Sequence, residues 1–395
     1  MTNVILKENI NWVGVIDWNI RDFHGYTTSR GTTYNAYLIR DEKIALIDTV
    51  KANFADELAG NIAELIAPER IDYIIVNHVE MDHSGSLTQI AKLAKNAKII
   101  ACQRGKDALI EHFGPEFSRV EVVKTGDELK LGKHTLRFLE TPMLHWPDSM
   151  FTYIVEDKIL MSNDAFGEHF ASSERFDDEV DQQVLMEECK TYFANILTPF
   201  AQLIIRKVQE VVQMGIQIEM IAPDHGVIWR KNPSKIIESY LRWSTFASTQ
   251  KVIVVFDTMW SSTDKMARAI EEGAASEGFE VKVLKLRATD QTDVVTEILD
   301  AKAVIVGSPT LNSQMFPSVS SFLTYVTGLK HRGKLWAFFG SYGWGGGAVR
   351  DMVEMAKKVG FEVYETSVEV KYVPDEEDLK KCFDFGQQIA KKVKG

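Results

Sequence analysis

Up to about residue 250, short β-rich apolar runs are mixed with helical stretches. Several runs follow one another closely enough to form hairpins, with Asp41 and Glu42 as one turn. Hairpins and strand pairs interspersed with helices predict two mixed sheets with helices outside them. The expected strands are residues 33–39, 43–48, 71–77, 97–101, 135–140, 150–155, 158–161 and 218–222, and the expected helical stretches are 54–66, 87–94, 179–214 and 234–247.

From residue 251 onward the pattern becomes regular, because strand-like runs alternate with helical stretches. This alternation indicates a parallel, doubly wound sheet with right-handed crossovers. We therefore expect an α/β protein of two domains, residues 1–250 and 251–395, without an internal repeat or flexible linker between them. The expected strands of the second domain are residues 252–256, 281–286, 303–307, 334–340 and 362–368.

Composition narrows the class of protein. A chain of 395 residues with 45% hydrophobic residues can bury two cores. The net charge of −11 argues against nucleic acid as a partner. No apolar run is long enough for a membrane span, and no secretory signal begins the sequence, so we expect a cytoplasmic protein. Cys102, Cys189 and Cys382 are scattered, which excludes a disulfide framework and a CxxC metal site.

A metal site is predicted where a buried strand ends. His78, Glu80, Asp82 and His83 follow the apolar run 71–77 within six residues, and carboxylate and imidazole are ligands that iron, zinc and manganese share. Three later positions also end apolar runs, so each side chain would reach one rim of a sheet. With the four residues of the first loop, these three positions make seven ligands. Seven ligands are enough for two metals if Asp164, the one carboxylate among the later positions, bridges them. These later positions are His145, Asp164 and His225, whereas His112, His134, His169 and His331 are interpreted as structural or surface residues.

The second domain carries three loops that suit a flavin. A hydroxyl-rich turn opens a helix directly after the first strand, where hydroxyls, backbone N–H groups and the helix dipole bind phosphate. Two further loops end the third and fourth strands, beyond which ligands bind in such sheets. Their glycines would let a planar ring approach. The residues of the three loops are Thr258, Met259, Trp260, Ser261, Ser262 and Thr263, then Ser308, Pro309, Thr310, Leu311 and Asn312, and finally Ser341, Tyr342, Gly343, Trp344, Gly345 and Gly346. This arrangement resembles flavodoxins, which bind FMN, so these are the expected flavin residues.

The metal segments resemble the metallo-β-lactamase superfamily, whose loop is usually His-x-His-x-Asp-His. Glu80 replaces the second histidine, which favours iron over zinc. This variant, joined to a flavodoxin-like domain, resembles the flavodiiron proteins, and local matches extend along nearly the whole chain. The resemblance implies an N-terminal metallo-β-lactamase-like αββα sandwich followed by a flavodoxin-like doubly wound parallel sheet. It implies one iron held by His78, Glu80 and His145, a second held by Asp82, His83 and His225, and Asp164 bridging them, with His24 and Tyr192 over the substrate side.

The function that follows is an oxidoreductase that passes electrons through FMN to two non-haem irons. The resemblance implies reduction of O2 to water, of NO to N2O, or both, in a head-to-tail homodimer or a dimer of dimers. The expected donor is external, since no fused rubredoxin is evident. By resemblance it is a separate rubredoxin, with a deazaflavin as the alternative. The preference between O2 and NO stays open. Two alternatives are a binuclear zinc hydrolase and a flavodoxin-type electron carrier whose metal domain is structural.

Overall fold

The computed structural model describes residues 4–394. The chain forms two compact units. The first contains the residues up to Tyr192 and Phe200–Leu241, and the second contains Phe193–Pro199 and the residues from Arg242 onward. Within residues 4–394, no helix combines the length and the apolar character that crossing a bilayer requires.

Two sheets form the centre of the first unit. The larger has seven strands in the order β1-β2-β7-β8-β9-β10-β11, and the smaller has five in the order β12-β13-β14-β15-β16. Two short pairs, β3 with β6 and β4 with β5, lie beside them. The bounds are β1 (Val4–Lys7), β2 (Ile10–Trp12), β3 (Val15–Asp17), β4 (Asp22–Phe23), β5 (Tyr26–Thr27), β6 (Thr32–Tyr34), β7 (Tyr37–Arg40), β8 (Ile44–Ile47), β9 (Tyr73–Ile75), β10 (Lys98–Ala101), β11 (Glu121–Val122), β12 (Glu128–Lys130), β13 (Thr135–Glu140), β14 (Met150–Ile154), β15 (Ile159–Met161) and β16 (Met220–Ala222).

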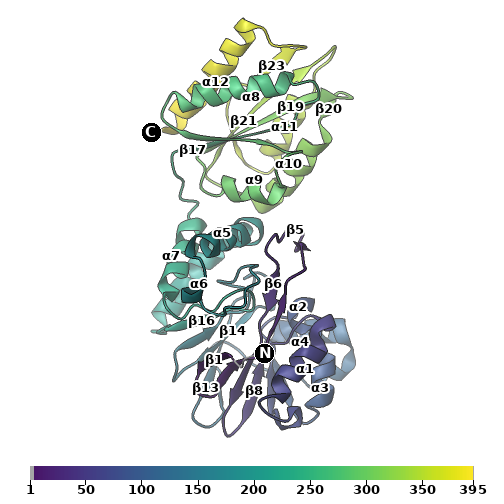
Figure 1. Ribbon diagram of the computed structural model, residues 1–395, viewed down its shortest axis with the longest axis vertical. Coiled ribbons are helices and arrows are strands. Elements are labelled where there is room, and N and C mark those ends of the chain that lie inside the picture. The colour runs from purple at the N-terminus through teal and green to yellow at the C-terminus, as the bar shows by residue number, and fades with distance from the viewer. Residues whose placement is uncertain (1–3, 395) are drawn as a thin grey trace. The chain divides into compact units, whose positions relative to one another are not determined.

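The layers of this unit follow from the alternation of side chains along each strand. In β8, Ile44 and Leu46 pack with Leu58, which belongs to α1, whereas Ala45 and Ile47 pack with residues of the smaller sheet. Helices α1, α3 and α4 therefore cover one outer face, and α5, α6 and α7 lie on the opposite side of the sheets (Figure 1). This is the expected αββα sandwich. The helices are α1 (Ala55–Ala63), α2 (Met81–Ser84), α3 (Leu87–Leu93), α4 (Gln103–Phe113), α5 (Gln182–Tyr192), α6 (Ala201–Gln213) and α7 (Pro233–Ser244).

Four strand ends bring the candidate metal loops to one edge. In the larger sheet β8 and β9 are parallel, so the loops that follow them leave at the same edge of that sheet. In the smaller sheet β15 and β16 are parallel, so the loops that follow these two strands also share an edge. Strand β13 runs antiparallel to β14, which runs antiparallel to β15, so β13 has the direction of β15. The loop after β13 therefore leaves at the same edge as the loop after β15.

One expected strand, residues 33–39, is wrong as a single element. It is divided into β6, which pairs with β3, and β7, which pairs with β8. The break falls at Asn35, whose buried side chain donates to the carbonyls of Pro223 and Gly226 and accepts from Trp12 Nε1. These distant partners hold the chain where it passes from one pair of strands to another.

The second unit has the expected doubly wound sheet. Its main path is β18-β17-β19-β21-β22, with β20 beside β19 and β23 beside β21, and neighbouring strands of the main path are parallel. Helices α8 and α12 pack together on one face, and α9 and α10 lie on the other (Figure 1). The bounds are β17 (Lys251–Phe256), α8 (Ser262–Ala275), β18 (Glu280–Lys285), α9 (Gln291–Ile298), β19 (Ala303–Leu311), β20 (Gln314–Met315), α10 (Pro317–Leu329), β21 (Leu335–Tyr342), α11 (Ala348–Lys358), β22 (Glu362–Val363), β23 (Val368–Lys371) and α12 (Glu376–Lys394).

Two expectations about this sheet need correction. Strand β19 does not end at Gly307 but continues to Leu311, with Ser308 and Pro309 in register with β21. Its pairing with β17 stops at Gly307, so Pro309 lies where one edge of the strand is free and its missing N–H is tolerated. The expected strand 362–368 is divided into β22 and β23, both paired with β21.

Candidate functional site

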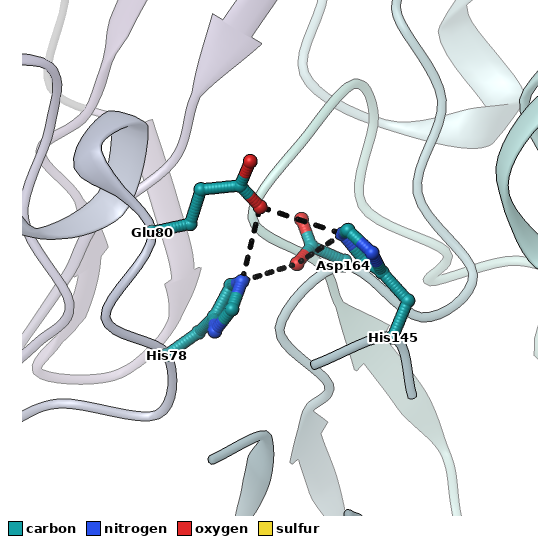
Figure 2. Close-up of side chains that lie close together, drawn as sticks. All are labelled: His78, Glu80, His145 and Asp164. Atoms are coloured by element: carbon teal, nitrogen blue, oxygen red, sulfur yellow. Dashed lines mark hydrogen bonds and ion pairs between the residues drawn. The ribbon is translucent and has the colours of Figure 1, made fainter. Parts of the chain in front are cut away.

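Two groups of ligand-type side chains lie close together in the first unit. The first group is His78, Glu80, His145 and Asp164, whose ligand atoms all lie within 4.8 Å of one another (Figure 2). Glu80 Oε2 is 3.2 Å from His78 Nε2 and 3.5 Å from His145 Nε2. Asp164 Oδ2 is 3.6 Å from each of the same two nitrogens. Two imidazoles and two carboxylates thus converge on one point.

The second group is Asp82, His83 and His225, also within 4.8 Å. Asp82 Oδ2 lies 3.0 Å from His83 Nε2 and 3.1 Å from His225 Nε2. The other carboxylate oxygen of Asp164, Oδ1, is 3.1 Å and 3.4 Å from these nitrogens. Asp164 therefore offers one oxygen to each group, which is the geometry that a bridging carboxylate requires.

The donor set fits cations in both groups. Asp82 Oδ1 and Oδ2, Asp164 Oδ2, and Nε2 of His145 and His225 are buried and make no hydrogen bond among the described residues. Burial alone would lower the pKa of His78, but Asp148 and Glu80 raise it to about 10. Buried carboxylates without hydrogen bonds are costly unless a cation compensates them, so the site favours positive charge. Nitrogen and oxygen donors suit iron, zinc or manganese.

Two ring nitrogens have outer partners that fix their tautomers. Asp148 Oδ2 accepts from His78 Nδ1 at 3.0 Å and from the backbone N–H of Val79 at 2.7 Å. The carbonyl of Thr33 accepts from His225 Nδ1 at 2.7 Å. Because a carbonyl and a carboxylate both accept, each Nδ1 carries a proton, which leaves Nε2 as the nitrogen that can bind a metal. His83 Nδ1 faces Asp224 Oδ2 at 3.6 Å without a hydrogen bond.

Both residues expected over the substrate side lie beside the metal groups. His24 occupies the two-residue turn between β4 and β5, and its Nε2 is 3.0 Å from Glu80 Oε1. The ring of Tyr192 is 6.3 Å from that of His225, and its buried hydroxyl makes no hydrogen bond within residues 4–394. Burial and the charge of Asp164 raise the pKa of Tyr192 well above its usual value. Tyr192 is therefore a neutral hydroxyl next to the site.

His169, which was interpreted as a structural or surface residue, is buried beside the site. It is 1% exposed, and its ring lies 4.7 Å from that of His225. A signal was present, since His169 follows Asp164 closely in a segment that is buried throughout. Asp148 was also missed, although it follows His145 by three positions. By contrast, His134 is structural, because its ring nitrogens contact Asp41 and Asp157.

In the second unit, a cavity of about 630 Å³ lies at the carboxyl ends of the strands. All three expected loops line it, as do Ser313, Tyr372 and Val373, which the sequence analysis missed. Trp260 and Trp344 are 89% and 94% exposed at its rim. Five expected residues are not among its lining residues, namely Thr258, Ser261, Thr263, Ser308 and Gly346.

Several of these non-lining residues support the loops instead. Thr263 Oγ1 is 2.9 Å from Ser341 Oγ, which ties the start of α8 to the end of β21. Asp257 is buried and accepts from the backbone of Thr258 and from Arg287 Nε. The loop that precedes α8 is thus held in place before any ligand binds, and the helix directs its positive end toward the cavity side.

Comparisons with known proteins agree with this architecture. Residues 32–226 match the family model described as ODP family beta lactamase, and residues 254–386 match that of flavodoxin. Fold and site together define a protein that joins a metallo-β-lactamase-like metal domain to a flavodoxin-like domain.

Three relatives identify the family. The nitric oxide reductase of Moorella thermoacetica is 47% identical over 393 residues, covering 99% of this chain and 98% of the relative. The rubredoxin oxygen:oxidoreductase of Desulfovibrio gigas has a TM-score of 0.97 at 41% identity, covering 100% of this chain and 99% of its own. The flavodiiron protein of Giardia intestinalis has a TM-score of 0.96 at 39% identity, with coverage of 100% and 97%. The chain belongs to the flavodiiron protein family and is an oxidoreductase.

Proposed function

We propose that this protein takes electrons from an external donor, passes them through FMN to a diiron site and reduces O2 to water, NO to N2O, or both. The proposal rests mainly on the position of Asp164, which offers one oxygen to each of the two ligand groups. The names of the relatives support it, since one is a nitric oxide reductase and another a rubredoxin oxygen:oxidoreductase.

The residues of the first unit would hold two irons. His78, Glu80 and His145 would bind one, and Asp82, His83 and His225 the other, with Asp164 between them. When bound, the irons would supply one-electron chemistry and open positions for a small gas. The chain itself keeps His78 and His225 in the ligating tautomer, and burial excludes bulk water from Asp82 and Asp164.

The residues of the second unit would hold FMN in the cavity at the strand ends. Ser262, at the start of α8, supplies a hydroxyl and a backbone N–H where a phosphate would bind. Gly343 and Gly345 leave room for a planar ring, and Trp260, Tyr342 and Trp344 offer aromatic faces. When bound, the flavin would accept and release electrons singly.

We further propose a rubredoxin-type donor, a cytoplasmic location and a head-to-tail homodimer, or a dimer of such dimers. The donor follows from the name of the Desulfovibrio relative. The dimer is supported by Trp260 and Trp344, because two large exposed aromatic side chains at a cavity rim are typical of an interaction surface.

Anaerobic stopped-flow mixing of the fully reduced protein with O2 and with NO tests the proposal. We expect at least one gas to oxidise the flavin rapidly in protein that contains about two irons per chain, and the faster gas defines the physiological preference. Failure of both gases would contradict the function.

Two control results would point to the alternatives. Zinc without iron in fully active protein would support the binuclear zinc hydrolase. Glu80 argues against that alternative, because its carboxylate adds an oxygen donor where the superfamily loop usually has a histidine. Full gas reduction by Asp164→Asn would support an electron carrier with a structural metal domain.

A further inference from the structure

A cluster of buried rings lies beside the second metal group, and His169 connects its members. The ring of His169 lies 5.5 Å from that of His24, 5.1 Å from that of Tyr192 and 4.7 Å from that of His225. His169 therefore touches both residues expected over the substrate side and one expected metal ligand. His169 is neither a proposed metal ligand nor one of the two residues expected over the substrate side.

The hydroxyl of Thr32 links two of these histidines. Thr32 Oγ1 is 2.8 Å from His169 Nδ1 and 3.4 Å from His225 Nδ1. His225 Nδ1 carries a proton, because it lies 2.7 Å from the carbonyl of Thr33, which can only accept. Thr32 Oγ1 can therefore only accept from His225, and its own proton remains available for another partner.

The shorter contact favours His169 as the acceptor of the Thr32 proton. The alternative acceptor, the carbonyl of Thr33, lies 3.3 Å from Thr32 Oγ1, whereas His169 Nδ1 lies at 2.8 Å. When the hydroxyl donates to His169 Nδ1, the single proton of the neutral imidazole lies on Nε2. Thr32 in this way sets the tautomer of His169.

The proton on His169 Nε2 has no acceptor among the residues that the structure describes. Nε2 is buried and makes no hydrogen bond among residues 4–394, and the same holds for the hydroxyl of Tyr192. Leaving a buried donor unpaired is costly, so such a group in a native structure is usually paired with water or with a bound molecule. Two unpaired polar groups side by side, next to the metal groups, indicate a small oxygen-bearing ligand.

We propose that His169 is a third substrate-side residue, whose Nε2–H donates a hydrogen bond to an oxygen of the bound gas or of the water that replaces it. Thr32 is the positioning residue that keeps the proton on Nε2. The inference rests on the proposed gas reduction and deepens it. His169 would then be a hydrogen-bond donor of fixed direction on the substrate side, beside His24 and Tyr192.

Matched pairs of variants test the role. His169→Phe keeps a ring but removes the donor, whereas His169→Gln returns an N–H near the Nε2 position. Thr32→Val removes the hydroxyl and keeps the shape, whereas Thr32→Ser keeps the hydroxyl. We expect the Phe and Val variants to retain iron and flavin but to slow flavin oxidation by the gas by about 10- to 100-fold, and the Gln and Ser variants to recover most of the rate.

The double variant separates a shared role from two independent ones. Since Thr32 acts through His169, combining Thr32→Val with His169→Phe should slow the reaction no further than His169→Phe alone. Additive losses, a full rate in His169→Phe, or loss of iron from that variant would each overturn the proposal.

A second readout does not depend on activity. In the full chain loaded with zinc, which is diamagnetic, ¹⁵N NMR of labelled histidines should show His169 protonated on Nε2, and Thr32→Val should redistribute that proton between the two nitrogens. A proton on Nδ1 in the unmodified chain would contradict the inference. If the unmodified protein reduced neither gas, the proposed function would fail, whereas the NMR result would still decide the role of Thr32.

Discussion

At the scale of single residues, the metal site depends on side chains that no metal would touch. Each of the two histidines with a fixed tautomer has an acceptor on its Nδ1, Asp148 for His78 and the carbonyl of Thr33 for His225. Burial raises the pKa of Asp148, but the hydrogen bond and charge of His78 outweigh it and lower the pKa below the usual value. Asp148 therefore stays ionised and orients His78.

We predict that Asp148→Asn weakens iron binding by about 10- to 100-fold, because the amide no longer supplies a negative charge behind His78. Competition with a chelator, followed by iron analysis, measures the effect. Asp107→Asn is the control, since Asp107 is exposed on α4 and bonds only Gln103 among the described residues. Equal iron affinity in the two variants would refute the orienting role.

At the scale of elements, the turn that carries His24 depends on backbone conformation. His24 and Gly25 both have positive φ, +54° and +77°, as the two central residues of a tight hairpin between β4 and β5. An added Cβ at Gly25 would meet nothing within 4 Å, so only the backbone demands glycine there.

Gly25→Ala should therefore lower the free energy of unfolding by roughly 1–2 kcal/mol and shift His24 away from Glu80. Gly60→Ala is a matched control, because a Cβ there also meets nothing, but Gly60 lies within helix α1. It should stabilise the protein by up to about 1 kcal/mol. Urea denaturation of both variants measures the two free energies of unfolding. Changes of the same sign in both variants would contradict the prediction that only Gly25 needs a positive φ.

Close helix packing gives the second unit a different requirement for glycine. A Cβ on Gly273 in α8 would lie 1.9 Å from the carbonyl oxygen of Phe383 in α12, and one on Gly386 would lie 2.1 Å from that of Ile270. The two helices thus approach backbone to backbone.

Gly273→Ala should destabilise the second unit by roughly 1–3 kcal/mol, since backbone atoms cannot move aside as a side chain can. In Gly328→Ala, within α10, a Cβ meets nothing within 4 Å, so no loss is expected. Thermal unfolding followed by flavin fluorescence compares the two. An unchanged midpoint in Gly273→Ala would show that the helices can separate.

The elements also show how far the sequence predicted the structure. The pattern of short apolar runs predicted most strands, because both sides of a strand such as β8 are buried against different layers. It failed at Asn35 and at Pro309, where partners distant in the sequence or a free strand edge decide the local structure. The metal loops were predictable because each follows an apolar run. The contact between His169 and Thr32 was not predictable, because the two residues lie 137 positions apart in the sequence.

At the scale of the whole molecule, family membership explains why two chemically different sites share one chain. Seven side chains from four loops of the first unit converge on two groups, and the second unit presents a cavity at its strand ends. Neither site alone would reduce a gas continuously, since one would bind it and the other would supply electrons. Their coupling is therefore the central property to test.

If the homodimer is head-to-tail, electrons cross from the flavin of one copy to the irons of the other. Asp164→Asn removes the bridging carboxylate, and Ser262→Glu places a negative charge where the flavin phosphate would bind, so each variant alone should be inactive. Unfolding and refolding the two together should restore roughly a quarter of the rate, because half of the dimers are mixed and each has one intact pair of sites. Mixing the folded variants without exchange is the control. No recovery in verified mixed dimers would mean that transfer stays within one chain.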